Sequence, residues 1–242
     1  MTYLQTMAIF TGLALGLPGL LGALVVVISH QNKLLSVQLG GFWAQILGGG
    51  LGIILHELSH LLVAVLFGHR ITKVALLRIP DRQDPTDQSL GYVNHAWNPH
   101  SLYQQAGNVF IGLAPVLICP IVMLLTTKWL VPVSYATLLG DLTSGASDPL
   151  GRVVVWLLLM INIAIGGFDV SPADLTNART GLVALAGCVV IFSGVLALFS
   201  DPTTLAAQLW TLLQPWYRTF VFAGAVNLLV YLALRCLRHA LR

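Results

Sequence analysis

Six long apolar stretches dominate this sequence, and they restrict what the chain can fold into more than any other feature. A helix needs about 20 apolar residues to cross the hydrocarbon core of a bilayer. Only 9% of the residues are charged and 57% are hydrophobic, whereas a soluble domain carries about 25% charged residues. The sequence therefore predicts an all-α polytopic membrane protein that faces lipid and other apolar helices over most of its length.

The apolar stretches predict about six transmembrane helices in a single membrane-embedded domain over residues 1–242. Eight of the 12 Lys and Arg residues fall on the side that would hold both termini. The positive-inside rule then predicts that both termini face the cytoplasm. The formal charge of +3 is small, and we expect no nucleic-acid partner. The predicted spans are Leu4–Ser29, Gly41–Phe67, Ala106–Leu125, Val153–Phe168, Leu182–Phe199 and Tyr217–Leu237.

The longest polar stretch between spans follows the second one and covers residues 69–105. Asp81–Ser89 is rich in Asp, Gln and Pro, which is typical of a turn. Leu90–Trp97 alternates between polar and apolar residues, as a strand with one buried face does. We therefore expect a small β-hairpin insert between Ile71 and Trp97.

The second span contains the sequence His-Glu-Leu-Ser-His at residues 56–60. On a helix, residues four apart share a face, so the imidazoles of His56 and His60 can bind one Zn²⁺. Glu57 can then act as general base toward a water molecule that the metal activates. The alternative is a polar cluster that holds helices together. Such a cluster needs neither this spacing nor a carboxylate, and charged residues inside a span are rare and usually functional.

A third metal ligand has to be Asp, His or Cys, because Glu57 is the only glutamate in the chain. Asp169 and Asp174 follow the fourth span, whose end shares a side with the end of the second. Asp169 lies closer to the end of that span. Asp174 needs the chain to turn back into the protein, which Gly166-Gly167 and Ser171-Pro172 permit. The histidines of the polar stretch, His69, His95 and His100, are expected at the surface.

With these features the chain resembles the site-2 protease family of intramembrane zinc metalloproteases, most closely its small bacterial branch. The resemblance covers a catalytic core of about residues 41–181. It rests on the motif in a hydrophobic helix, the hairpin-like insert after it, Gly107-Asn108 with Pro115 in the third span, and the segment from Ser171 to Gly181. The Leu-Asp-Gly sequence of many members is absent.

The resemblance implies a zinc-dependent endopeptidase with one Zn²⁺ per chain, which cleaves membrane-spanning or membrane-adjacent segments of membrane protein substrates. It favours Asp174 as the third ligand, and Asp169 would then orient a ligand or be a solvated loop residue. Asn108 and Asn162 either stabilise the oxyanion or pack helices together. The alternative function is a catalytically silent metal-binding membrane protein, such as a partner subunit or a transporter.

Overall fold

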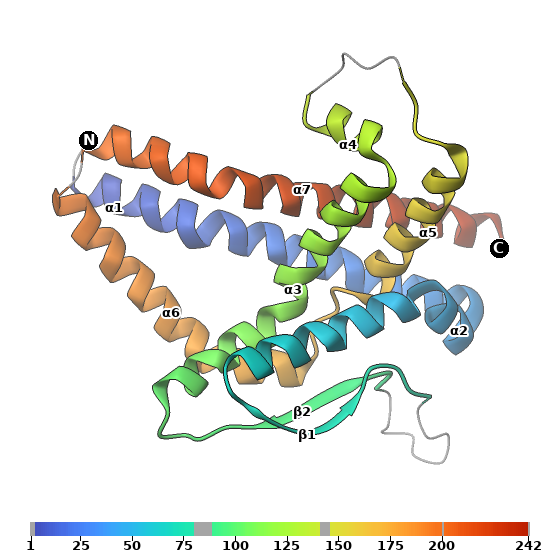
Figure 1. Cartoon of the computed structure of the whole chain (residues 1–242), viewed down its shortest axis with the longest axis horizontal. Coiled ribbons are helices and arrows are strands. Elements are labelled where there is room, and N and C mark those ends of the chain that lie inside the picture. Colours follow the sequence, from blue (N-terminus) through green and yellow to red (C-terminus); the bar gives the residue numbers. More distant parts are fainter. Residues whose placement is uncertain (1–2, 80–88, 141–145, 200, 242) are drawn as a thin grey trace.

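The computed structural model describes residues 3–79, 89–140, 146–199 and 201–241, and these are mostly helical (Figure 1). Four helical stretches in the described residues are long and apolar enough to cross a membrane: Tyr3–Leu66, Leu102–Leu130, Gly181–Leu198 and Ala206–Ala240. Another apolar helix, α5 (Leu150–Gly166), is shorter. The fold is thus that of a membrane-associated helical protein, and the expected count of six spans stays a prediction.

The first stretch consists of α1 (Tyr3–Thr11), a π-helical turn η1 (Gly12–Gly16) and α2 (Leu17–Leu66). Gly40 and Gly41 interrupt α2 with non-helical backbone angles, and the φ of Gly41 is 65°. Glycine adopts this left-handed conformation without the steric cost that other residues pay. The break separates two helical segments, and residues 30–39, which the span assignment left as a connection, continue the first of them.

The remaining helices follow α2 in the chain, and three of them pack directly against it (Figure 1). They are α3 (Leu102–Leu130), the short α4 (Pro132–Leu138), α5, α6 (Pro172–Phe199) and α7 (Pro202–Ala240). The largest buried side chains of the core include Met123, Met160 and Phe168, which pack with Val25 and Cys119 in one cluster. This cluster joins α2, α3 and α5 directly beside the His-Glu-Leu-Ser-His motif.

Glycines allow α2 and α5 to approach closely. A Cβ atom on Gly166 would collide with the backbone oxygen of Gly49, and one on Gly52 would collide with that of Asn162. Small residues at a helix crossing are a common packing device in membranes. The side chain of Asn162 adds polar contacts, since its Nδ2 donates to Leu47 O at 3.0 Å and its Oδ1 accepts from Leu51 N at 2.8 Å. Asn162 thus fixes α5 against the turn of α2 that precedes His56.

The first and last long helices run in the same direction, side by side (Figure 1). Tyr217 Oη donates to Leu13 O at 2.6 Å, and Arg238 donates to Gln38 at 2.8 Å. Between these contacts, the buried Asn32 donates from Nδ2 to Asn227 O at 3.1 Å. Six complete crossings would make the first and last helices antiparallel. The parallel course of α1–α2 and α7 therefore does not match six complete crossings.

The predicted hairpin is present as an antiparallel pair of strands, β1 (Arg70–Ala75) and β2 (Tyr92–Ala96). In the register, Ala75 pairs with Tyr92 and Arg70 with Ala96, with an irregularity between Ile71 and Lys73. The hairpin lies along the second segment of α2 (Figure 1). Most of the predicted turn, Asp81–Ser89, falls in residues 80–88, outside the described residues.

Candidate metal centre

Three side chains from two distant parts of the chain converge at the motif. His56 and His60 lie on the second segment of α2, and Asp174 lies in the first turn of α6. His60 Nε2 is 3.0 Å from His56 Nε2 and 3.5 Å from Asp174 Oδ1. One ligand atom of each residue lies within 4.8 Å of the others, and the two histidines are buried. The structure therefore brings together the three residues that the sequence and the resemblance favoured as ligands.

Backbone carbonyl groups hold both imidazoles by the nitrogen that faces away from the centre. His56 Nδ1 lies 3.2 Å from Gly167 O, and His60 Nδ1 lies 2.7 Å from Ile111 O. A carbonyl oxygen accepts only, so each Nδ1 carries the proton and donates. In the neutral ring, each Nε2 then presents a lone pair. Two lone pairs and a carboxylate oxygen that face one another in a buried site repel, unless a cation lies between them.

The Asp174 carboxylate is oriented by the start of its own helix. Ser171 N and Ser171 Oγ donate to Asp174 Oδ2 at 2.9 and 2.6 Å, and Asp174 N donates back to Ser171 Oγ at 3.1 Å. This reciprocal pattern is a capping box, with Pro172 at the first helical position. Because the box uses Oδ2, the other oxygen is directed toward His60.

The donor types suit Zn²⁺, and two of the three ligand-atom distances are close to those of a zinc site, while the third pair lies within 4.8 Å. Zinc binds imidazole and carboxylate ligands at about 2.0–2.1 Å in tetrahedral geometry, which places neighbouring ligand atoms about 3.3 Å apart. The distances of 3.0 and 3.5 Å around His60 Nε2 lie on either side of this value. If these three residues held Zn²⁺, they would supply three ligands, the number that catalytic rather than structural zinc sites take from the protein. The hydrogen bonds to Gly167 and Ile111 are the kind that orient metal-binding histidines.

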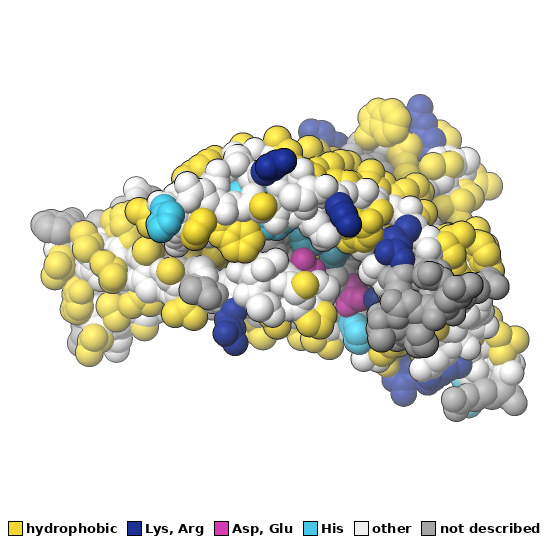
Figure 2. Space-filling model, turned by 90° about the horizontal axis from the view of Figure 1, so that it is seen from below, with side chains coloured by type: hydrophobic (Ala, Val, Ile, Leu, Met, Phe, Trp, Pro, Cys, Tyr) yellow, Lys and Arg dark blue, Asp and Glu magenta, His cyan; other side chains and the backbone are white. Residues whose placement is uncertain are grey.

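Glu57 lies next to the three ligands, against the start of β2. A Cβ atom on Gly91 would come within 2.6 Å of Glu57 Cγ and 2.9 Å of its Oε1. A cavity of about 690 Å³ contains Glu57 together with His56, His60 and Asp174, and the residues of β2 from Tyr92 to His95 line its other side. Viewed from the hairpin side, acidic side chains are visible in a hollow near the middle of the molecule (Figure 2). The centre is therefore open to a molecule from outside.

Asp169, the alternative ligand, pairs with α2 instead. Its Oδ2 accepts from Lys33 Nζ at 2.6 Å, and its Oδ1 lies 2.9 Å from His30 Nδ1. Burial tends to raise the pKa of Asp169, but the hydrogen bond and the charge of Lys33, together with His30, outweigh burial and lower it. A smaller cavity of about 140 Å³ is lined by both Asp169 and Glu57. Asp169 thus lies beside the centre without joining the cluster of ligand atoms.

The two asparagines have different surroundings. Asn162 uses its amide on the backbone of α2, as described above, which is a packing contact. Asn108 is buried on α3, one turn before Ile111, and its Oδ1 has no hydrogen-bond partner among the described residues. Neither Asn108 nor Asn162 lines the cavity that holds the ligands.

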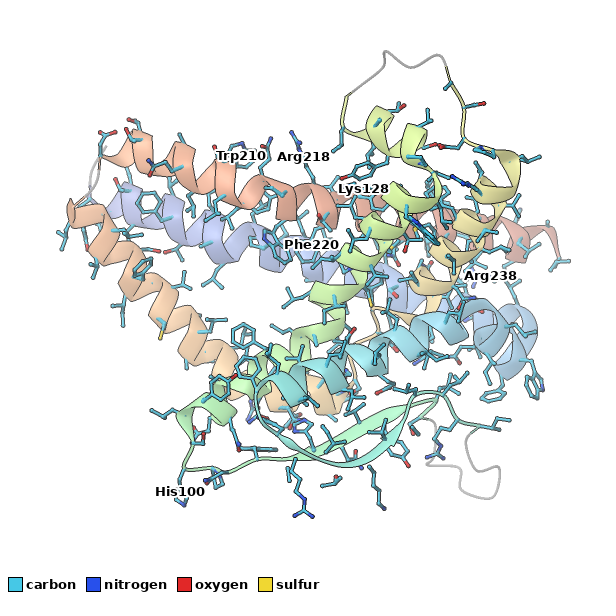
Figure 3. All side chains as sticks on the ribbon, viewed as in Figure 1. His100, Lys128, Trp210, Arg218, Phe220 and Arg238 are labelled. Atoms are coloured by element: carbon cyan, nitrogen blue, oxygen red, sulfur yellow. The ribbon has the colours of Figure 1, made fainter. Side chains whose placement is uncertain are left out.

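The expectation that His69 and His95 lie at the surface is wrong for His69 and incomplete for His95. His69 is buried, and its Nε2 donates to Gln104 O at 2.8 Å. Its Nδ1 lies 2.9 Å from His95 Nδ1, and His95 is half-buried on the face of β2 that lines the cavity. Trp97 stacks on His69, with ring centroids 5.9 Å apart. His100 is exposed as expected, and it projects from the hairpin side of the molecule (Figure 3).

The chain was compared with family models, curated proteins and solved structures, and no match was found in any of the three comparisons. The geometry of the centre therefore carries the functional argument.

Proposed function

We propose that this protein is a zinc-dependent intramembrane endopeptidase, which hydrolyses peptide bonds in membrane-spanning or membrane-adjacent segments of other proteins. The observation that carries the proposal is the convergence of His56 Nε2, His60 Nε2 and Asp174 Oδ1 beside Glu57, in a cavity bordered by a strand. A purely structural metal site needs no carboxylate next to its ligands. The apolar helices that surround the centre support a substrate located in or beside the bilayer.

Each residue of the centre has a defined part in this chemistry. His56, His60 and Asp174 would hold one Zn²⁺, which when bound supplies the Lewis acidity that lowers the pKa of a water molecule and polarises a carbonyl group. Glu57 accepts the proton of the attacking water and returns it to the amine of the leaving group. The carbonyl groups of Gly167 and Ile111 keep both histidines in the tautomer that binds metal.

A substrate segment has to be extended before its peptide bonds are accessible, because helical hydrogen bonds occupy its carbonyl groups. The strand β2 borders the cavity, and it pairs on one edge with β1. An extended segment that adds to the other edge of β2 by β-augmentation would satisfy its own backbone groups. The hairpin is therefore proposed to hold the substrate, and the lipid bilayer and a membrane protein substrate are the partners.

We further propose a multi-pass arrangement in which the C-terminal end of α7, with Arg235 and Arg238, faces the cytoplasm. The count of basic residues favours a cytoplasmic N-terminus as well. The parallel course of the first and last long helices favours the opposite side for the N-terminus, if both helices cross the bilayer completely. The side of the membrane on which Tyr3 lies therefore distinguishes the two arrangements.

The test of the function uses purified protein in detergent, with zinc measured by elemental analysis and cleavage measured on β-casein, an unfolded polypeptide. We expect one zinc per chain. Glu57→Gln should keep the zinc and lose cleavage, whereas His56→Ala should lose both. A silent metal-binding protein would give no cleavage in the unmodified chain at any zinc occupancy. Equal zinc content in the unmodified protein and in His56→Ala would refute the metal centre itself.

A further inference from the structure

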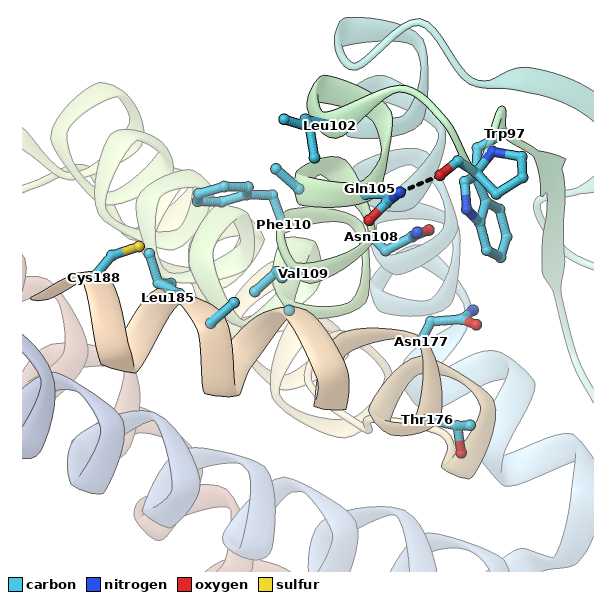
Figure 4. Close-up of a pocket in the computed structure, with 14 residues that line it drawn as sticks. Trp97, Leu102, Gln105, Asn108, Val109, Phe110, Thr176, Asn177, Leu185 and Cys188 are labelled. Carbon is cyan, nitrogen blue, oxygen red and sulfur yellow. Dashed lines mark hydrogen bonds between the residues drawn. The ribbon is translucent and has the colours of Figure 1, made fainter.

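A second hollow lies between the start of α3 and the first half of α6, and it adjoins the cavity of the centre. It has a volume of about 560 Å³ (Figure 4). Trp97 and Asn177 line both this groove and the cavity that contains the metal ligands. The groove and the cavity of the centre therefore border on each other at these two side chains.

The groove changes in character along its length. Its far part is apolar, with Val109 and Phe110 on α3 and Leu185 and Cys188 on α6. Side-chain amides lie closer to the start of α3 and α6, where Gln105, Asn108 and Asn177 are found (Figure 4). An entirely apolar ligand such as an acyl chain has no use for amides. A peptide that is helical in the apolar part and extended near the centre needs hydrogen-bond partners in that second part, and amides both donate and accept.

Asn108 gives independent support for a polar ligand. It is 8% exposed, and its Oδ1 has no hydrogen-bond partner within the part of the chain that the structure describes. A buried acceptor without a donor is unfavourable. Gln105 differs, because its Nε2 donates to the backbone oxygen of Pro99 (Figure 4). Asn108 is thus an amide at the groove whose oxygen is buried and lacks a donor among the described residues, and the freed backbone N–H of an unwound segment would supply one.

We infer that the groove between α3 and α6 receives the transmembrane helix of the substrate. The helical part of the substrate packs on the apolar residues, and its unwound part crosses Asn108 and Asn177 to reach the centre. This inference rests on the proposed function, because it names where that substrate enters. The helix α6 can border an entrance from the lipid side, since only 11% of its apolar stretch Gly181–Leu198 is buried within the protein.

The native cysteines offer a direct test. Cys188 lines the groove and is exposed, Cys236 on α7 is exposed elsewhere, and Cys119 is buried. The probe is a synthetic Leu/Ala transmembrane peptide with lysines at both ends, a central Asn-Gly pair and a single cysteine, reconstituted in phosphatidylcholine vesicles with the Glu57→Gln protein. Under mild oxidation, we expect the disulfide with Cys188 to form about ten-fold faster than that with Cys236. A cysteine-free copy of the peptide should compete.

Two variants control for the shape of the groove. Ala184→Trp fills it and should abolish the preference for Cys188. Val183→Trp places the same side chain at a 71% exposed position of the same helix that does not line the groove, and it should leave the preference intact.

Three results would overturn the inference: equal rates at Cys188 and Cys236, a disulfide between two copies through Cys188 that the peptide does not displace, or labelling of Cys188 by a photoreactive phospholipid that the peptide does not reduce. The last two would assign the groove to a second copy or to lipid. Because the cross-link forms in a protein that does not hydrolyse, the two proposals can fail separately. Selective cross-linking without any cleavage by the unmodified chain would refute the proposed protease activity but support the groove as a binding site for a transmembrane helix.

Discussion

Lys33 Nζ lies 2.6 Å from Asp169 Oδ2, and this ion pair ties the first segment of α2 to the loop between α5 and α6. The same loop supplies Gly167 O, which orients His56, and leads to Ser171, which orients Asp174. Both side chains of the pair are partly shielded from solvent. One ion pair outside the candidate metal centre therefore restrains the loop that orients two of its three proposed ligands.

The first prediction distinguishes Asp174, the proposed metal ligand, from Asp169, which would act only by restraining the loop that orients the ligands. Asp174→Asn should reduce zinc binding below detection, because the amide has no negative charge to offer the metal. Asp169→Asn and Lys33→Met should each weaken zinc binding by about 10-fold, at the lower end of the range for residues that orient ligands. The measurement is competition with a chelator of known affinity. A reversed order of Asp174→Asn and Asp169→Asn would show that the wrong carboxylate has been assigned.

The pH dependence of the Lys33–Asp169 ion pair follows from the lowered pKa of Asp169. A carboxylate with a lowered pKa contributes stability above its unfolded-state pKa of about 3.9, and that contribution is lost as the pH falls through the folded-state value. The ion pair should therefore persist throughout the neutral range. Replacing Asp169 should have the same effect on zinc affinity at pH 6 and at pH 8, and an effect that grows between these values would point to a different group.

A second prediction concerns the close contact of Gly91 with Glu57. Gly91→Ala places a methyl group in the space of the Glu57 carboxylate, so that the base is displaced. A displacement of about 1 Å can cost on the order of 100-fold in rate, and we expect kcat to fall by about that amount with zinc content unchanged. Gly50→Ala is the matched control, since its Cβ would meet only Leu77 at 3.7 Å. Equal rates in the two variants would mean that Glu57 is not held by the hairpin.

The histidine pair of the hairpin gives a third prediction. Burial lowers the pKa of His95, and the neighbouring His69 lowers it further. The unfolded chain then binds more protons than the folded one below about pH 6.5, so stability falls with decreasing pH. Hydrogen exchange of residues 92–96, corrected for its intrinsic rate, should become faster from pH 7.5 to pH 5.5. His95→Gln should remove this acceleration, and the exposed His100→Gln should not.

A fourth prediction addresses the topology. We expect Leu241→Cys to be unreactive toward an impermeant maleimide added to intact cells, because basic residues near the end of α7 favour the cytoplasm. If both of the parallel helices cross the bilayer completely, Tyr3→Cys should react from outside. Protection of both positions until the cells are opened would restore the shared cytoplasmic side, and it would mean that one of the two helices crosses only in part. The background protein for both variants carries Cys188→Ser and Cys236→Ser.

The convergence of His56, His60 and Asp174 depends more on local sequence patterns than does the arrangement of the helices around them. The spacing of His56 and His60 fixes their geometry locally, since residues four apart share a face on any helix. The position of Asp174 also has a local signal, since Ser171-Pro-Ala-Asp174 matches a capping box with proline at the first helical position. That pattern places the start of α6 at Pro172 rather than at Leu182. It also explains why one oxygen of the Asp174 carboxylate binds Ser171 while the other is directed toward His60.

Other features depend on contacts between distant parts of the chain, and no local pattern indicates them. The collision of a side chain at position 91 with Glu57 exists only after the hairpin has packed on α2. His69 is buried where the start of α3 and the strand β2 come together, and it contacts Gln104 and His95 there. Residues 30–39 include polar positions such as Asn32 and Lys33, which resemble a loop in sequence. They remain helical because Asn227 and Asp169, from other helices and loops, bind them.

The placement of the ligands on α2 and on the first turn of α6 also bears on how long the protein survives in a cell. A metal ion held by His56, His60 and Asp174, as proposed, would link two distant parts of the chain, and its loss would remove that link between α2 and the start of α6. Chains that have not acquired their metal would then expose this region to quality-control proteases, whose action follows the population of opened forms. Metal supply would in this way set the abundance of the protein as well as its activity.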